Sequence, residues 1–170
     1  MAAGDAPVTT GATRSGGCQC GAVRYHAAGE LRYPHLCHCR MCQKAAGNYF
    51  MPLAAVMRSD FMLTRGAPSW FQSSKLVRRG FCSKCGTPLF YDIFEADFIN
   101  ITLGSLDDPN AVKPVMQSNT SRKMSWFHEL DGLPREPETD APVREATIAA
   151  TSCQHPDCDT QTWPAENKHE

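Results

Sequence analysis

The 170-residue chain lacks the signals that mark membrane and secreted proteins. It has no run of about 18 apolar residues, so the sequence predicts no membrane-spanning helix. Residues 1–17 contain a single basic residue, Arg14, and no apolar segment of the kind found in a secretory signal peptide. We therefore expect a cytoplasmic protein, with the nucleus as the second choice.

Several functional signatures are also missing. The chain has neither a Gly-x-Ser-x-Gly nucleophile elbow nor a glycine-rich loop of the kind that binds phosphates. Residues 1–130 carry 14 basic and nine acidic residues, whereas residues 131–170 carry three basic and nine acidic ones. This mildly cationic body suits a small anionic ligand but lacks the dense basic face that nucleic-acid binding requires. The sequence predicts no nucleic-acid or membrane partner and leaves the oligomeric state unknown.

Helical periodicity is scarce, since no such pattern extends beyond about two turns. Residues 23–26 alternate as in a half-buried strand, and residues 69–79 are expected to form a strand pair. The strongest strand candidates, Leu89–Phe94 and Phe98–Leu103, are rich in aromatic and β-branched residues. Pro52 predicts an edge strand or a bend, because proline cannot donate to a sheet ladder. The sequence therefore predicts a mainly β fold of short strands.

The composition divides the chain into three regions. Residues 1–14 are small and polar, which predicts a disordered leader. Residues 15–130 contain the strand candidates and are predicted to form the zinc-binding domain. Residues 131–170 are acidic and contain five prolines. This tail offers little apolar surface to offset the entropy lost on ordering, so we expect it not to pack.

Cysteine, in contrast, is abundant. The chain has nine cysteines and no export signal, a combination that favours metal binding over disulfides. Gly86 follows the last pair in the domain, where it allows the left-handed turn that closes a zinc knuckle. The seven cysteines of the domain form a Cys-x-Cys pair (Cys18, Cys20), a Cys-x-Cys-x-x-Cys triplet (Cys37, Cys39, Cys42) and a Cys-x-x-Cys pair (Cys82, Cys85).

Seven sulfurs divide naturally into a closed site of four and an open site of three. Three sulfurs leave one tetrahedral corner of zinc for water or substrate, as in catalytic sites. The predicted cofactor is therefore two zinc ions per chain, one structural and one catalytic. One alternative closes the triplet with His26, His35 or His38, which would make both sites structural. In another, one zinc is structural and the remaining thiols are merely buried.

Other polar residues near the triplet allow two interpretations. Arg40, Lys44 and Arg122 are candidates for binding an acidic group of a substrate, and the alternative is solvated surface charge. The ring of His38 is predicted to point away from the ion, because its neighbours Cys37 and Cys39 both act as ligands. In the tail, Cys153 and Cys158 flank His155 and are predicted to be free thiols rather than a third metal site.

Four motifs in the order of the chain give it a specific resemblance to a known family. They are GCQCGAVRY (17–25), CHCRMC (37–42), FCSKCGTPLF (81–90) and NITLGSLDDP (100–109). With them the chain resembles the glutathione-dependent formaldehyde-activating enzymes, a family that includes centromere protein V. The resemblance covers about residues 15–130 and all seven cysteines of the domain.

The resemblance implies a β-tent fold of antiparallel sheets. It implies a structural zinc on Cys18, Cys20, Cys82 and Cys85, and a zinc associated with activity on Cys37, Cys39 and Cys42. The implied activity is that of a carbon–sulfur lyase, which joins glutathione to formaldehyde to give S-hydroxymethylglutathione. The chain departs from the family pattern at Gln117, Arg122 and Ser125, where many relatives carry His, Ser and Pro. A different glutathione or thiol conjugate, or a non-catalytic zinc-folded interaction module, therefore remains as an alternative.

Overall fold

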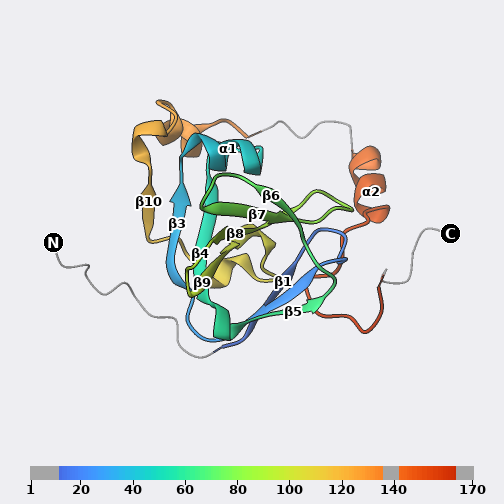
Figure 1. Cartoon of the computed structure of the whole chain (residues 1–170). Coiled ribbons are helices and arrows are strands. Elements are labelled where there is room, and N and C mark those ends of the chain that lie inside the picture. Colours follow the sequence, from blue (N-terminus) through green and yellow to red (C-terminus); the bar gives the residue numbers. More distant parts are fainter. Residues whose placement is uncertain (1–11, 136–141, 164–170) are drawn as a thin grey trace.

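Strands dominate the protein, whose computed structural model describes residues 12–135 and 142–163 (Figure 1). The leader predicted at residues 1–14 lies largely outside the described residues, although Arg14 already begins the first strand. The strands of the described chain are β1 (Arg14–Gly17), β2 (Arg24–Ala27), β3 (Arg32–Cys37), β4 (Met51–Met57), β5 (Phe61–Arg65), β6 (Ser69–Gln72), β7 (Val77–Phe81), β8 (Pro88–Ile93), β9 (Phe98–Thr102) and β10 (Met116–Ser118).

These strands form two sheets. The smaller sheet has the order β1-β2-β5, and the larger one has the order β10-β3-β4-β9-β8-β7-β6. All pairings are antiparallel except that between β10 and β3. The mainly β fold predicted from the sequence is confirmed, as are the β6–β7 and β8–β9 strand pairs.

The main hydrophobic core lies between the two sheets. Tyr25 of β2 packs against Phe90 of β8 with ring centroids 5.4 Å apart, and Phe61 of β5 contacts the same ring at 5.3 Å. Ala54 and Val56 of β4 are fully buried in this core. Since side chains alternate along a strand, the intervening residues of β4 point to the opposite face of the large sheet.

Pro52 lies in an interior strand, which corrects the expectation of an edge strand or bend. Strand β4 is paired with β3 on one side and β9 on the other. The pairing with β9 begins only at Leu53, which lies opposite Thr102, whereas Pro52 lies opposite Leu36 of β3. Proline is tolerated because it occupies the end of β4 where only one neighbouring strand is present.

Two short α-helices accompany the sheets in the residues that the structure describes. Helix α1 (Arg40–Ala46) begins within the cysteine triplet and ends at Gly47, which has a left-handed backbone. Helix α2 (Pro142–Ala150) was not predicted from the sequence. Its described side chains are all exposed, so the segment has no buried face that would produce a helical pattern of apolar residues. In the described part of the chain, no helix is long and apolar enough to cross a membrane. The 3₁₀ segments described are η1 (Arg58–Asp60), η2 (Leu103–Ser105), η3 (Pro109–Ala111), η4 (Thr120–Arg122) and η5 (Phe127–Gly132).

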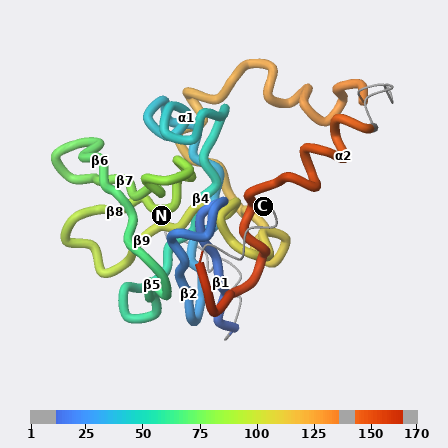
Figure 2. The backbone as a smooth tube through the Cα atoms, turned by 90° about the vertical axis from the view of Figure 1, so that its right-hand side faces the viewer, coloured from blue at the N-terminus to red at the C-terminus, as the bar shows by residue number. Residues whose placement is uncertain are grey.

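Residues 152–163, which we call the C-terminal strap, pack back against the domain. In Figure 2 the strap runs from α2 down beside β1 and β2. His155 is 5% exposed, and Asp159 bonds to Arg24 and His26 of β2. The expectation that the tail does not pack is wrong for this segment. The strap is held largely by hydrogen bonds and ion pairs, so its low apolar content did not reveal the contact.

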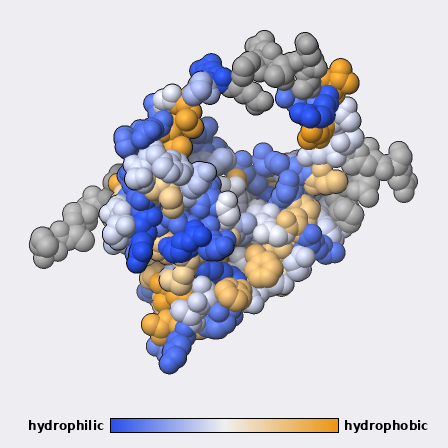
Figure 3. All heavy atoms as spheres, turned by 90° about the horizontal axis from the view of Figure 1, so that it is seen from above, coloured by the Kyte–Doolittle hydropathy of each residue, from blue (hydrophilic) through white to orange (hydrophobic). Residues whose placement is uncertain are grey.

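The outer surface is mixed in character. The face drawn in Figure 3 intersperses hydrophilic and hydrophobic residues. Such a mixture is usual for a folded domain, whose surface always retains much apolar area.

Candidate metal centres and the adjoining cavity

The first cysteine group comprises Cys18, Cys20, Cys82 and Cys85, whose sulfurs all lie within 4.8 Å of one another. The Sγ atoms of Cys18 and Cys20 are 3.6 Å apart, and those of Cys20 and Cys82 are 3.8 Å apart. Tetrahedral zinc with bonds of about 2.3 Å separates its sulfurs by about 3.8 Å. The group therefore fits zinc, and the structure brings together the four sulfurs that the spacing predicted.

The turns that carry these sulfurs are shaped to hold thiolates. The backbone N–H of Val23 donates to Cys18 Sγ at 3.2 Å, and that of Lys84 donates to Cys82 Sγ at 3.4 Å. Gly86 has φ +78°, which confirms the left-handed turn predicted after the knuckle. Burial raises the pKa of the Cys18 thiol to about 12, so a bound cation is needed to stabilise its thiolate.

The C-terminal strap covers the first of these turns. The backbone N–H of His155 donates to the Gln19 carbonyl at 2.7 Å, and the indole Nε1 of Trp163 donates to the Cys20 carbonyl at 2.6 Å. The ammonium group of Lys84 lies 4.6 Å from the centre of the Trp163 ring. The strap thereby joins the Cys-x-Cys turn to the Cys-x-x-Cys turn from outside.

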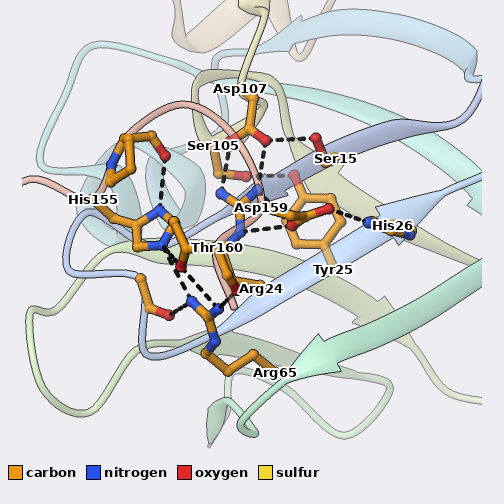
Figure 4. A network of polar contacts seen from close by, with 12 residues as sticks. Ser15, Arg24, Tyr25, His26, Arg65, Ser105, Asp107, His155, Asp159 and Thr160 are labelled. Carbon is orange, nitrogen blue, oxygen red and sulfur yellow. Dashed lines mark hydrogen bonds and ion pairs between the residues drawn. The ribbon is translucent and has the colours of Figure 1, made fainter. Parts of the chain in front are cut away.

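An ion-pair network around the buried Arg24 anchors the strap (Figure 4). Arg24 is 3% exposed and contacts Asp107 at 2.6 Å and Asp159 at 2.9 Å. Ser15 donates to Asp107 at 2.5 Å. Burial by itself raises the pKa of Asp107, but the hydrogen bonds from Arg24 and Ser15 outweigh it, so the net pKa lies below the ordinary value. Arg65 extends the network by donating to the Thr160 carbonyl.

The second group comprises Cys37, Cys39 and Cys42, again with sulfurs within 4.8 Å. Cys37 ends β3, Cys39 caps the N-terminus of α1, and Cys42 lies in its first turn. Cys37 and Cys42 are buried, and Cys39 accepts from the Cys42 N–H at 3.4 Å. The three sulfurs can hold a metal ion. No fourth ligand from the described residues belongs to the group, so three sulfurs would fill three of the four positions of a tetrahedral zinc ion.

The pKa values of two of these thiols are shifted in opposite directions. The hydrogen bond with Cys42 lowers the pKa of Cys37 to about 4. The same contact and burial raise the pKa of Cys42 above its ordinary range. The contact therefore favours the thiolate form at Cys37 and the thiol form at Cys42.

The three histidines weighed as a fourth ligand are engaged elsewhere. His38 is fully buried, and its Nε2 lies 3.0 Å from Gln117 Oε1. His35 Nδ1 lies 2.8 Å from the Tyr33 carbonyl, which can only accept, so Nδ1 carries the proton. His26 pairs with Asp159. None of them belongs to the cysteine group, which agrees with the prediction that His38 points away from it.

Arg79, a buried arginine on β7, was not among the site residues predicted from the sequence. It is 6% exposed, and its Nη2 lies 3.5 Å from Cys42 Sγ. Its Nε donates to Ser73 at 3.1 Å, and its guanidinium lies 4.9 Å from the centre of the Tyr91 ring. No acidic side chain of the described residues forms an ion pair with it. Strand alternation could have indicated its burial, because it places the side chains of Arg78 and Arg79 on opposite faces of the sheet.

A cavity of about 600 Å³ opens beside the cysteine triplet. None of Arg40, Lys44 and Arg122, the cations proposed from the sequence, lines it. Instead Arg79 lies near the sulfurs. The lining of the cavity includes the three cysteines, the polar or charged side chains of Arg79, His35, Tyr91, Asn100, Arg32 and Asp97, and the apolar side chains of Leu53, Ala55, Met57, Ile93 and Phe98.

The segment that departs from the family pattern lies against the triplet. Asn119 Nδ2 donates to Cys37 Sγ at 3.6 Å, and Gln43 Nε2 donates to the Arg122 carbonyl at 3.0 Å. Asn119 lines the cavity, but Gln117 does not. Gln117 instead contacts His38, which lies between Cys37 and Cys39 in the sequence.

The strap contains no third metal group. Cys153 and Cys158 are exposed free thiols, as predicted, and His155 instead contacts Arg65 at 3.2 Å and Thr160 at 2.9 Å. Among the described residues, the groups that could hold a metal ion are the two formed by the seven cysteines of the domain.

Comparison with known proteins agrees with this arrangement. The family model described as glutathione-dependent formaldehyde-activating enzyme matches residues 13–122. A Halomonas elongata protein, provisionally named a glutathione-dependent formaldehyde-activating enzyme, is 31% identical over 83 residues. That match covers 44% of this chain and 53% of the relative, so the chain spans about half the length of this curated protein.

A solved structure supports the fold. The crystal structure of a Rhodobacter sphaeroides protein matches with a TM-score of 0.50 and 21% identity, covering 61% of this chain and 99% of that one. The family match spans both cysteine groups and ends before α2 and the C-terminal strap. The chain therefore belongs to the glutathione-dependent formaldehyde-activating enzyme family.

Proposed function

We propose that this protein is a zinc-dependent carbon–sulfur lyase that forms or cleaves S-hydroxymethylglutathione from glutathione and formaldehyde. The observation that carries the proposal is the cysteine triplet, which lacks a fourth ligand from the described residues and lies at a cavity of about 600 Å³. In this proposal Cys37, Cys39 and Cys42 hold the catalytic zinc. Cys18, Cys20, Cys82 and Cys85 hold a structural one.

The reaction joins a thiol to an aldehyde. The sulfur forms a bond to the carbonyl carbon, the carbonyl π electrons move to oxygen, and that oxygen takes up the proton that the thiol released. Zinc on the triplet supplies a Lewis acid that lowers the pKa of a thiol or polarises an aldehyde oxygen. The three cysteines hold the metal and form no bond to the substrate.

Two further side chains of the cavity have proposed roles. Arg79 places a buried positive charge beside Cys42 and so favours negative charge on the sulfurs and on a bound substrate. His35 carries its proton on Nδ1, which leaves Nε2 able to exchange a proton with the substrate oxygen. The buried wall formed by Leu53 and Asn100 limits the access of water.

We place this activity in residues 15–130 and in the cytoplasm. None of the nine cysteines forms a disulfide, and a reducing compartment keeps cysteines in this state. The acidic tail, residues 131–170, lies beyond the family match, and its strap contributes to the four-sulfur site rather than to the cavity.

The test is exchange NMR of glutathione with formaldehyde, in which the uncatalysed rate is compared with the rate in the presence of the zinc-loaded protein. Acceleration that is lost in a folded Cys42→Ala variant is the expected result. The control is Cys153→Ala, which removes an exposed thiol outside both groups. A protein with two zinc ions and no acceleration would contradict the formaldehyde reaction.

A further inference from the structure

The cavity beside the triplet has an elongated apolar floor on one face of the large sheet. Leu53, Ala55 and Met57 are alternate residues of β4, and all three line it. The four residue steps from Leu53 to Met57 span about 13 Å along the strand. Ile93 of β8 and Phe98 of β9 widen the floor beside them. The apolar surface is thus much longer than a hydroxymethyl group.

This floor is continuous with the proposed reaction site. The three cysteines, Arg79, Met57 and Phe98 all line the same cavity. Residue 37 lies opposite residue 51 in the β3–β4 pairing, and residue 32 lies opposite residue 55. The strand pair therefore leads directly from the sulfur at Cys37 to the floor at Ala55.

The polar side chains of the lining border the floor. Arg32 lies opposite Ala55 in the β3–β4 pairing, and Asn100 lies opposite it in the β4–β9 pairing. Half of the Arg32 side chain is exposed, and it contacts Glu30 at 3.7 Å. Asp97, in the turn before β9, is the acidic residue of the lining. The side chains of Leu53, Ala55, Met57, Ile93 and Phe98 carry no charge, and Arg32 at their border is already paired with Glu30. Burial of an unpaired charge on these five side chains is costly. The charged ends of glutathione are therefore unsuited to this surface.

We propose that the apolar floor binds the substituent on the substrate sulfur, and that this substituent is an apolar chain of several carbons. This inference rests on the proposed lyase function and specifies its substrate class: thiol adducts of apolar aldehydes larger than formaldehyde. The sulfur lies at the triplet, the chain lies along β4, and the charged peptide remains at the solvent-exposed rim.

Inert thioethers test the proposal without requiring turnover. We would measure the Kd of S-methyl-, S-propyl-, S-butyl- and S-hexylglutathione for the zinc-loaded protein by isothermal titration calorimetry. Each methylene buried on the floor is expected to lower the Kd about fourfold, which corresponds to about 0.8 kcal/mol. An affinity independent of chain length would overturn the proposal, as would the absence of binding by every member.

Matched charge variants locate the effect. Ala55→Asp places a carboxylate on the floor and is expected to abolish the dependence on chain length. Met62→Asp places the same charge on β5, where Met62 is 57% exposed and outside the cavity, and is expected to retain it. If Ala55→Asp does not fold, Met57→Asp at the half-buried edge of the floor takes its place. Equal chain-length dependence in the floor and surface variants would refute the proposed location.

The formaldehyde exchange assay separates this inference from the function on which it rests. Normal exchange with a flat thioether series would overturn the apolar substrate class and leave the lyase function standing. A steep series without formaldehyde exchange would support the apolar site and contradict formaldehyde as the aldehyde. These two failures therefore give different results.

Discussion

The guanidinium of Arg79 lies 3.5 Å from the sulfur of Cys42, although the two residues are 37 positions apart in the chain. Both side chains are buried, and no acidic residue in the described chain forms an ion pair with the arginine. Three thiolates on zinc carry a net charge of −1, which one guanidinium neutralises. This relationship links the large sheet to the electrostatics of the cysteine triplet.

Replacing Arg79 is therefore expected to weaken metal binding at the triplet. Arg79→Gln should lower the zinc affinity of that site about tenfold, the effect typical of losing a group that supports a metal ligand. Competition with a chromophoric chelator would measure it. The control is Arg78→Gln, which removes an equal charge from a residue that pairs with Asp92 and not with the cysteines. Equal zinc affinities in the two variants would contradict the role of Arg79.

The contact between His38 and Gln117 should contribute to stability. Gln117 Oε1 accepts from the fully buried His38 ring, so Gln117→Leu leaves a buried donor unsatisfied. We expect the free energy of unfolding to fall by about 2 kcal/mol, measured by urea denaturation with zinc present. Gln117→Glu retains an acceptor oxygen and should remain at least as stable near neutral pH. A leucine variant as stable as the unaltered protein would contradict this assignment.

The Asp107 carboxylate should make stability depend on pH. Its pKa in the folded protein lies below the ordinary value of 3.8, so its contribution is present above that value and is lost as the pH falls through the lower, folded pKa. Asp107→Asn should cost about 3 kcal/mol near neutral pH, because it removes one partner of the buried Arg24.

The measurement compares urea denaturation of Asp107→Asn and the unaltered protein between pH 3 and pH 7. Protonation of Asp107 in the unaltered protein should narrow the difference between the two below about pH 4. Loss of zinc from protonated thiols affects both proteins and leaves their difference informative. A difference that stays constant across this range would contradict the linkage.

The C-terminal strap should retain zinc at the four-sulfur site. A chain ending at Thr151 loses the hydrogen bonds that His155 and Trp163 donate to the Cys-x-Cys turn. Zinc release from this site to a chelator should then become about tenfold faster. Trp163→Phe is the milder comparison, since it keeps an aromatic ring but loses the Nε1 donor. The strap has no such role if truncation leaves the release rate unchanged.

Local features of this protein could be predicted from the sequence. The cysteine spacings and Gly86 indicated the metal-binding turns, because those turns are formed by residues a few positions apart. Alternation and β-branched residues indicated β8 and β9 for the same reason. The count of seven cysteines suggested one group of four and one group of three. In the structure, the sulfurs within each of these two groups lie close to one another.

Other features depended on contacts between distant segments. The burial of Arg79 beside Cys42 follows from the pairing of β7 with β8 and from the place of α1 over the sheet. The position of Pro52 was acceptable only because β9 ends one residue away. The strap docks through polar groups, so its composition alone indicated an unpacked tail. The sequence by itself determined which residues can bind metal. The tertiary structure decided that Arg79, the apolar floor of the cavity and the C-terminal strap surround them, because these neighbours come from distant segments of the chain.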